Sequence, residues 1–230
     1  TLVLVAVSLF QFLMHLPLLP SVMQDEYVYL SQALFTPLSA DVYGNFVYSL
    51  IYSPLAMFGE SFYVIAKLLN TFFLFGFIFV VYIFGVEFIG RKLALLIAVA
   101  TGFGSISLYS SFFMPEMMFY FFASITLFSL YKAISTTEAG RFWFIASLGS
   151  LTLTGLVKPH AFILWIGLLI FLILMLARDK ERRRVLVVWV SSMFFGYPTL
   201  KVSLGFLMAG EVGLTFLGRG YEESLFKFLE

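Results

Sequence analysis

The sequence predicts an all-α fold, a polytopic bundle of about seven transmembrane helices. Of the 230 residues, 61% are hydrophobic and only 12% are charged, which is about half of the roughly one-quarter that soluble domains carry. Apolar runs of roughly 20 residues, the length that crosses the hydrocarbon core as a helix, recur along the whole chain. Because these runs are continuously apolar and do not alternate, a transmembrane β-barrel is disfavoured.

Hydropathy separates the chain into seven predicted spans. The first is interpreted as a transmembrane helix and not as a signal peptide, because no A-x-A-like cleavage site follows it. The fifth and sixth spans are short, and Lys158-Pro159 separates them with hardly any loop. The predicted spans are 1–20, 62–89, 93–113, 117–134, 142–157, 161–177 and 185–208.

The basic residues predict the orientation, because cytoplasmic loops carry an excess of Lys and Arg. With a cytoplasmic N-terminus, the cytoplasmic loops hold nine of the fourteen Lys and Arg residues, whereas acidic residues gather on the opposite side. The nine are Arg91, Lys92, Lys132, Arg141, Arg178, Lys180, Arg182, Arg183 and Arg184. The acidic residues are Asp25, Glu26, Asp41, Glu60 and Glu116.

This topology divides the chain into a transmembrane module, residues 1–208, and an outside segment, residues 209–230, that leads to further helices or a domain. Within the module, residues 21–61 form the first outside loop, which is rich in aromatic residues. Tyr27, Leu30 and Leu34 are spaced to share one face of a short helix. We therefore expect short helices that lie in the membrane interface.

The composition also excludes several functions. The chain contains no cysteine, so disulfides, thiolate nucleophiles and zinc-thiolate sites are impossible. The net charge is +1, and no basic patch is interleaved with aromatic residues as single-strand binders require. Nucleic acid is therefore not an expected partner, whereas membrane lipids are.

Asp25 and Glu26 are the first candidates for a catalytic site. They follow a predicted span directly and are surrounded by apolar residues, which would hold them near the membrane surface. A partly desolvated carboxylate suits general base catalysis. The alternative is an interfacial loop with solvated charges.

Further ionisable groups are expected at the same membrane face. Glu116 follows Pro115 in a tight turn and is either a site residue or a first-turn acid favoured by the helix dipole. Lys158 either binds a phosphate as a point charge or extends to the interface; Lys67 has the same two interpretations. His160, two residues after Lys158, is either part of the site or an interfacial polar residue.

Four stretches of this chain resemble, in order, the N-terminal half of polyprenyl-phosphate-dependent glycosyltransferases of the GT-C fold. This family is typified by protein O-mannosyltransferases and the lipid A aminoarabinose transferase. The likeness covers the chain up to about Leu176. The stretches are QDEYVYLSQAL, YSLIYSPLAMFGESFYVIAKLLNTFF, SLYSSFFMPEMMFYFFASITLFSLYKA and GLVKPHAFILW.

The resemblance implies a GT-C bundle that transfers a sugar from a polyprenyl-phosphate donor, with inversion, to a hydroxyl of a protein, lipid or glycan. Asp25 matches the family's candidate base, with Glu26 beside it. Glu116 matches a second acid that positions substrate or holds a divalent cation. Lys158 matches the lysine that contacts the donor phosphate. We expect an enzyme of the prokaryotic plasma membrane with its active site on the extracytoplasmic face.

Two other functions remain open from the residues alone. A transporter or flippase for a lipid or small anion would share the many spans and the outside lysine, but it would also carry polar residues buried within its spans. A non-catalytic subunit that scaffolds a larger membrane complex would leave the acidic residues merely solvated.

Overall fold

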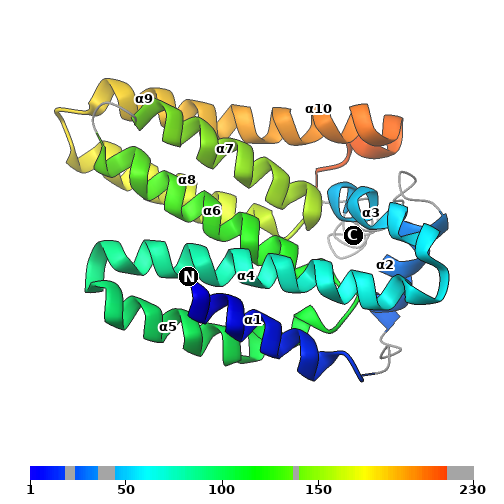
Figure 1. Ribbon diagram of the computed structural model, residues 1–230. Helices are drawn as coiled ribbons and strands as arrows, with labels where there is room; N and C mark the ends of the chain where they lie inside the picture. Colours follow the sequence, from blue (N-terminus) through cyan, green and yellow to red (C-terminus); the bar gives the residue numbers. More distant parts are fainter. Residues whose placement is uncertain (19–23, 36–44, 137–139, 217–230) are drawn as a thin grey trace. The chain divides into compact units, whose positions relative to one another are not determined.

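The chain is built from helices. The computed structural model describes residues 1–18, 24–35, 45–136 and 140–216, and no strand occurs among them (Figure 1). The longer helices are α1 (Leu2–His15), α2 (Gln24–Phe35), α4 (Phe62–Ile89), α5 (Arg91–Phe103), α6 (Glu116–Ser135), α7 (Gly140–Val157), α8 (Ala161–Arg178), α9 (Arg183–Ser191) and α10 (Tyr197–Ala209). The short ones are α3 (Phe46–Tyr52), η1 (Ser53–Ser61), η2 (Ser105–Ser110), η3 (Ser192–Gly196) and η4 (Gly210–Leu214).

Five of the predicted spans are found as helices long and apolar enough to cross a membrane. Helix α4 covers the predicted span 62–89, and the apolar helical stretch that contains it runs over Phe46–Ile89. The other four are Glu116–Ser135, Gly140–Val157, Ala161–Arg178 and Arg183–Ala209. The chain is therefore an all-helical protein with the character of a membrane protein.

The predicted spans 1–20 and 93–113 correspond to shorter helices. Helices α1 and α5 have 14 and 13 residues, so each is about 20 Å long, against a hydrocarbon core of about 30 Å. Helix α5 ends where Gly104 adopts extended backbone (φ −73°, ψ 172°). The Ser107 and Ser110 hydroxyls then donate to nearby backbone carbonyls, at 2.8 and 2.7 Å. Such local bonds compete with a continuing helix, so the expected span 93–113 is interrupted.

The chain divides into two compact units, each of which is described by itself. Unit 1 comprises Thr1–Pro37 and Tyr48–Phe128, and unit 2 comprises Leu38–Val47 and Ser129–Glu230. The predicted first outside loop, 21–61, is helical over Gln24–Phe35 and from Phe46 to its end. Its residues 21–23 and 36–44 lie outside the described residues, as do residues 217–230 of the predicted outside segment.

Unit 1 is organised around the α4–α5 hairpin. Gly90 reverses the chain with φ +78°, a left-handed conformation that glycine adopts without strain. Helix α1 packs against both helices of the hairpin (Figure 1). A Cβ atom on Gly102 of α5 would lie 2.7 Å from a Val7 side-chain carbon of α1, so this contact requires glycine. Leu4 and Ile78 are completely buried.

Unit 2 packs α7 to α10 around an apolar core that includes the fully buried Leu151, Leu172, Met193 and Tyr197. The indole N–H of Trp165 in α8 donates to the Met193 carbonyl at 2.8 Å, in the π-helical turn η3 that joins α9 to α10. This bond ties α8 to the π-helical turn within the last predicted span.

One end of unit 2 is basic. The end of α6 and the start of α9 meet there, because the Arg182 guanidinium donates to the Ile134 carbonyl at 2.6 Å. Arg141, at the start of α7, lines the same depression as Arg182. Arg141 and Arg182 therefore lie together at one end of unit 2.

Candidate functional site

The acidic pair lies in the first turn of α2, where the helix dipole favours negative charge. Consecutive residues of a helix point about 100° apart, and the two carboxylates accordingly differ in environment. Asp25 is exposed, whereas Glu26 is only 2% exposed. The pair therefore supplies one carboxylate that solvent or a substrate can reach and one that belongs to the protein interior.

The buried carboxylate connects α2 to the Pro-Glu turn. The backbone N–H of Phe113 donates to Glu26 Oε1 at 2.9 Å. Phe113 lies two residues before Pro115 and three before Glu116, the first residue of α6. Two of the stretches that carry the family resemblance, 87 residues apart, thus meet at a buried, charge-assisted hydrogen bond, one of the stronger kinds in proteins.

Aromatic rings enclose this bond. The Phe113 ring contacts the rings of Tyr48, Tyr52 and Phe62, with centroids 5.2 to 5.4 Å apart. Tyr48 also stacks on Tyr52 at 4.4 Å and meets Tyr29 of α2 edge-on at 5.9 Å. Edge-to-face and offset contacts of this kind add to the stabilisation from burial. The aromatic residues that hydropathy assigned to an outside loop therefore form part of the core of unit 1.

The Tyr48 hydroxyl lies inside this aromatic enclosure. It is fully buried and has no hydrogen-bond partner among the described residues. Both Glu26 and Glu116 are near enough to Tyr48 to interact with it electrostatically. The structure therefore brings Glu26 and Glu116 to the same region of unit 1.

Two further side chains, Asn70 and His15, form hydrogen bonds with the segment that precedes Glu116. Asn70 of α4 accepts a hydrogen bond from the Tyr52 hydroxyl and donates to the Phe112 carbonyl at 2.7 Å. His15 Nδ1 lies 3.1 Å from Ser110 Oγ. Because the Ser110 hydroxyl already donates to a backbone carbonyl, His15 acts as the donor in this pair. The sequence analysis did not select Asn70 or His15. Each could have been noticed as a polar side chain within an otherwise apolar run.

Lys67 binds backbone carbonyls at the C-terminal end of α1. Its ammonium donates to the backbone carbonyl of His15 at 3.0 Å and to that of Leu18, and its side chain is buried. The last carbonyls of a helix have no partner within the helix, so Lys67 caps α1 from α4. In this arrangement, two of its three N–H donors are already used by the protein.

We expect Lys67→Met to lower stability more than it lowers substrate affinity. Two carbonyls would lose a charged donor, and a hydrogen bond to a charged group contributes about 1.5–3 kcal/mol. Thermal unfolding of the purified protein measures this loss. Lys92→Met, at an exposed position of α5, is the matched control and should leave the unfolding temperature nearly unchanged. A Lys67→Met protein as stable as the control would contradict the capping role.

Glu116 opens α6. The Pro115 carbonyl accepts the backbone N–H of Phe119 at 2.9 Å, so the helix begins at the turn, and Glu116 lies in its first turn with 8% exposure. Among the residues that the structure describes, no group of three or more His, Cys, Asp and Glu side chains could hold a metal ion. The divalent cation that the resemblance allows at Glu116 therefore has no such ligand set in this part of the chain.

Lys158 and His160 belong to unit 2, where they form the tight turn between α7 and α8. The Lys158 N–H closes the last turn of α7 by donating to the Thr154 carbonyl at 2.9 Å. The Lys158 carbonyl in turn accepts the N–H of Ala161, the first residue of α8, at 3.2 Å. Lys158 is half-buried and His160 is exposed. The short connection predicted here is confirmed.

Unit 2 also holds a buried lysine that sequence reasoning did not select. Lys201 of α10 is 4% exposed, and its ammonium donates to the Phe216 carbonyl and lies 4.6 Å from the centre of the Phe216 ring. Tyr197, one turn earlier, has a buried hydroxyl. A Cβ atom on Gly155 of α7 would lie 2.6 Å from that hydroxyl and 3.2 Å from Lys201 Cδ. The sequence could have indicated Lys201, because it is the single basic residue within the predicted span 185–208.

Comparison with known proteins adds no relative. No protein-family model, no curated protein and no solved structure matches the chain.

Proposed function

We propose that this chain is part of an integral-membrane glycosyltransferase that moves a sugar from a polyprenyl-phosphate donor to an acceptor hydroxyl. The observation that supports the proposal most is the division of labour in the acidic pair. Glu26 is buried and fastened to Phe113 at the Pro-Glu turn, which leaves the neighbouring Asp25 exposed on a helix whose position is fixed. A general base requires this combination of access and rigid placement.

The proposed reaction is a single displacement at the anomeric carbon. The acceptor hydroxyl oxygen forms a bond to that carbon while the bond from the carbon to the phosphate oxygen breaks. The lipid phosphate leaves with the electron pair, the acceptor proton passes to Asp25, and the sugar configuration inverts. Lys158, with His160, is the proposed phosphate ligand, because stabilising charge that develops on a leaving group is commonly the largest electrostatic contribution.

Glu26 and Lys67 take supporting roles in this proposal. Glu26 is a positioning residue, since its carboxylate is occupied by the Phe113 N–H. Lys67, already bound to two backbone carbonyls, holds α1 against α4 and is not assigned to the donor phosphate. Glu116, at the start of α6 and near the same aromatic enclosure, would position the acceptor or the sugar. The site is proposed to lie on the extracytoplasmic face.

The direct test uses the chain reconstituted in lipid vesicles with a radiolabelled sugar on undecaprenyl or dolichyl phosphate. We expect the protein to release polyprenyl phosphate and to transfer the label to an added hydroxyl acceptor. Because the acceptor is unidentified, release of polyprenyl phosphate is the primary readout. Failure of every donor of this class to react would overturn the proposal.

Transport is the second candidate, and the buried Lys201 favours it. A charged side chain inside a predicted span is expensive and commonly marks a path for ions or substrates. The neighbouring α7 adds four buried hydroxyl side chains: Ser147, Ser150, Thr152 and Thr154. In the same vesicles, uptake of a labelled anion that Lys201→Met abolishes, without any donor consumption, would favour a transporter over a transferase.

A further inference from the structure

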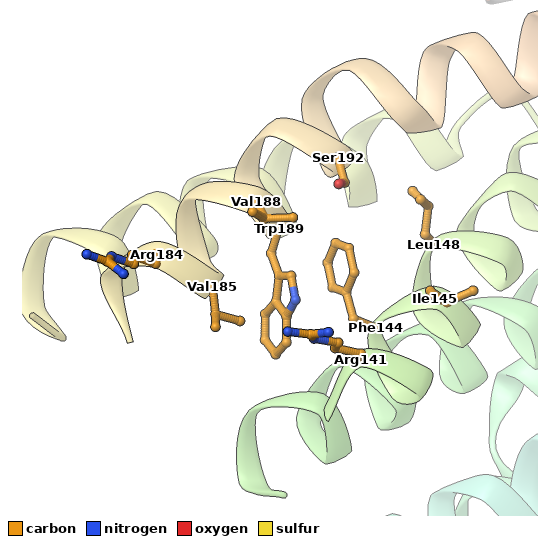
Figure 2. A pocket seen from close by; sticks show the side chains of 9 residues that line it. All are labelled: Arg141, Phe144, Ile145, Leu148, Arg184, Val185, Val188, Trp189 and Ser192. Atoms are coloured by element: carbon orange, nitrogen blue, oxygen red, sulfur yellow. The ribbon is translucent and has the colours of Figure 1, made fainter. Parts of the chain in front are cut away.

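A groove with apolar walls and a basic end runs between α7 and α9 in unit 2. Its volume is about 440 Å³, and Figure 2 shows the side chains that line it. The parallel-stacked rings of Phe144 and Trp189, 4.9 Å apart, form its middle. The remaining lining residues are Arg141, Ile145, Leu148, Arg184, Val185, Val188 and Ser192.

Charge and apolar surface are separated along the groove. Arg141 and Arg184 occupy the first turns of α7 and α9, which both begin at the basic end of unit 2. Leu148 and Ser192 lie seven and eight residues further along, so at 1.5 Å per residue the apolar part extends about 10–12 Å from the arginines. A ligand that fits this pattern has an anionic head and an apolar tail.

The two arginines are available for such a head group. Both are exposed, and neither has a hydrogen bond or ion pair to another residue that the structure describes. Arg182, by contrast, is engaged with Asp179 at 3.9 Å and with the Ile134 carbonyl. The guanidinium fork matches a phosphate in geometry and binds it with paired hydrogen bonds.

The outer walls of the apolar part are exposed, whereas Phe144 and Trp189 at its middle are buried. Ile145 and Val188 are 68% and 60% exposed, and the indole of Trp189 lies among them, as is common for tryptophan near a membrane surface. From these observations we propose that the groove binds one anionic phospholipid, with its phosphate at the basic end where Arg141 and Arg184 line the groove and one acyl chain along Phe144 and Val188. Basic pockets between transmembrane helices bind anionic head groups in this way.

This lipid site is independent of the proposed transfer reaction. It lies at the basic end, which the sequence assigns to the cytoplasm, and it shares no residue with the proposed transferase site. A lipid here would fasten α7 to α9 on the side where anionic lipids are abundant. The two proposals can therefore be tested separately. Either the transferase proposal or the lipid site can be contradicted without affecting the other.

The test titrates the purified full chain with phosphatidylglycerol or phosphatidylcholine and counts bound lipid by native mass spectrometry. A hydrogen bond to a charged group contributes about tenfold or more to binding, so Arg141→Gln with Arg184→Gln should weaken phosphatidylglycerol binding at least about tenfold. Arg183→Gln removes the same charge one residue from Arg184, outside the lining set, and should leave binding nearly unchanged. Val188→Trp should obstruct the groove and weaken binding of both lipids.

Three outcomes would overturn the lipid site. The first is equal binding of both lipids by the unaltered protein, which describes an ordinary lipid-facing surface. The second is an Arg141→Gln, Arg184→Gln protein that binds phosphatidylglycerol as well as the Arg183→Gln control does. The third is complete competition by free glycerol phosphate, which would make the site a phosphate site and not a lipid site. Thermal unfolding of each variant confirms that it is folded.

Discussion

Asp25→Asn should reduce sugar transfer by about 10²–10⁴-fold, the usual contribution of a general base. Asparagine has nearly the same shape as aspartate but cannot accept the acceptor proton at neutral pH. The Asp25 side chain is exposed, so the substitution should leave the unfolding temperature within the small range typical of surface changes. The measurement is the initial rate of polyprenyl phosphate release at saturating donor.

The matched control for this prediction is Glu60→Gln, which neutralises another exposed carboxylate of the same predicted loop. It should retain nearly full activity. If Asp25→Asn and Glu60→Gln have the same rate as the unaltered protein, Asp25 is not the base. If both lose activity equally, general surface charge and not a specific proton acceptor is responsible.

Glu26→Ala should cause the largest loss of stability among the changes in the acidic pair. It removes the acceptor of the buried Phe113 N–H, and an unsatisfied buried group costs about 1–3 kcal/mol, more where the lost partner was charged. It also leaves a cavity beside the Tyr48 and Phe113 rings. Thermal or denaturant unfolding of the purified protein measures the effect.

Two variants make the Glu26 prediction specific. Glu26→Gln keeps a side-chain oxygen that accepts the Phe113 N–H, so it should recover most of the lost stability. Asp25→Ala deletes the adjacent carboxylate at an exposed position, and it should change the unfolding free energy by less than about 0.5 kcal/mol. Equal destabilisation by Glu26→Ala and Asp25→Ala would show that the bond to Phe113 does not hold α2 in place.

The helices were the most predictable part of this protein. Hydropathy averages over many residues, and it placed 62–89 and four later spans where the structure has long apolar helices. It could not locate the end of α5 at Gly104, because the serines and aromatic residues that follow are apolar enough on average to extend the run. The helix ends there because of local hydrogen bonds from serine hydroxyls to backbone carbonyls. A hydropathy average over many residues does not detect such bonds.

The candidate site was predictable in its residue types and much less so in its roles. The sequence drew attention to Asp25 and Glu26 as a pair. Which of them faces the protein interior depends on how α2 is rotated about its axis when it packs, and the sequence pattern did not reveal this. The partner of Glu26 is a backbone N–H, and every non-proline residue has one, so no side-chain pattern could identify Phe113. Lys67 was expected at a phosphate or at the interface, whereas its bonds to the end of α1 depend on tertiary packing. Lys201 was visible as an isolated cation but was not selected.

The bond between Glu26 and Phe113 also imposes an order on how the protein is made. A ribosome completes residues 24–35 long before it reaches Phe113, so the Glu26 carboxylate emerges with no backbone donor waiting for it. Helix α2 can settle into its final position only after all of α4 and all of α5 have been synthesised. During that interval the nascent chain carries an unneutralised acid next to the bilayer, and truncated products that end before residue 113 should be substrates for membrane quality control.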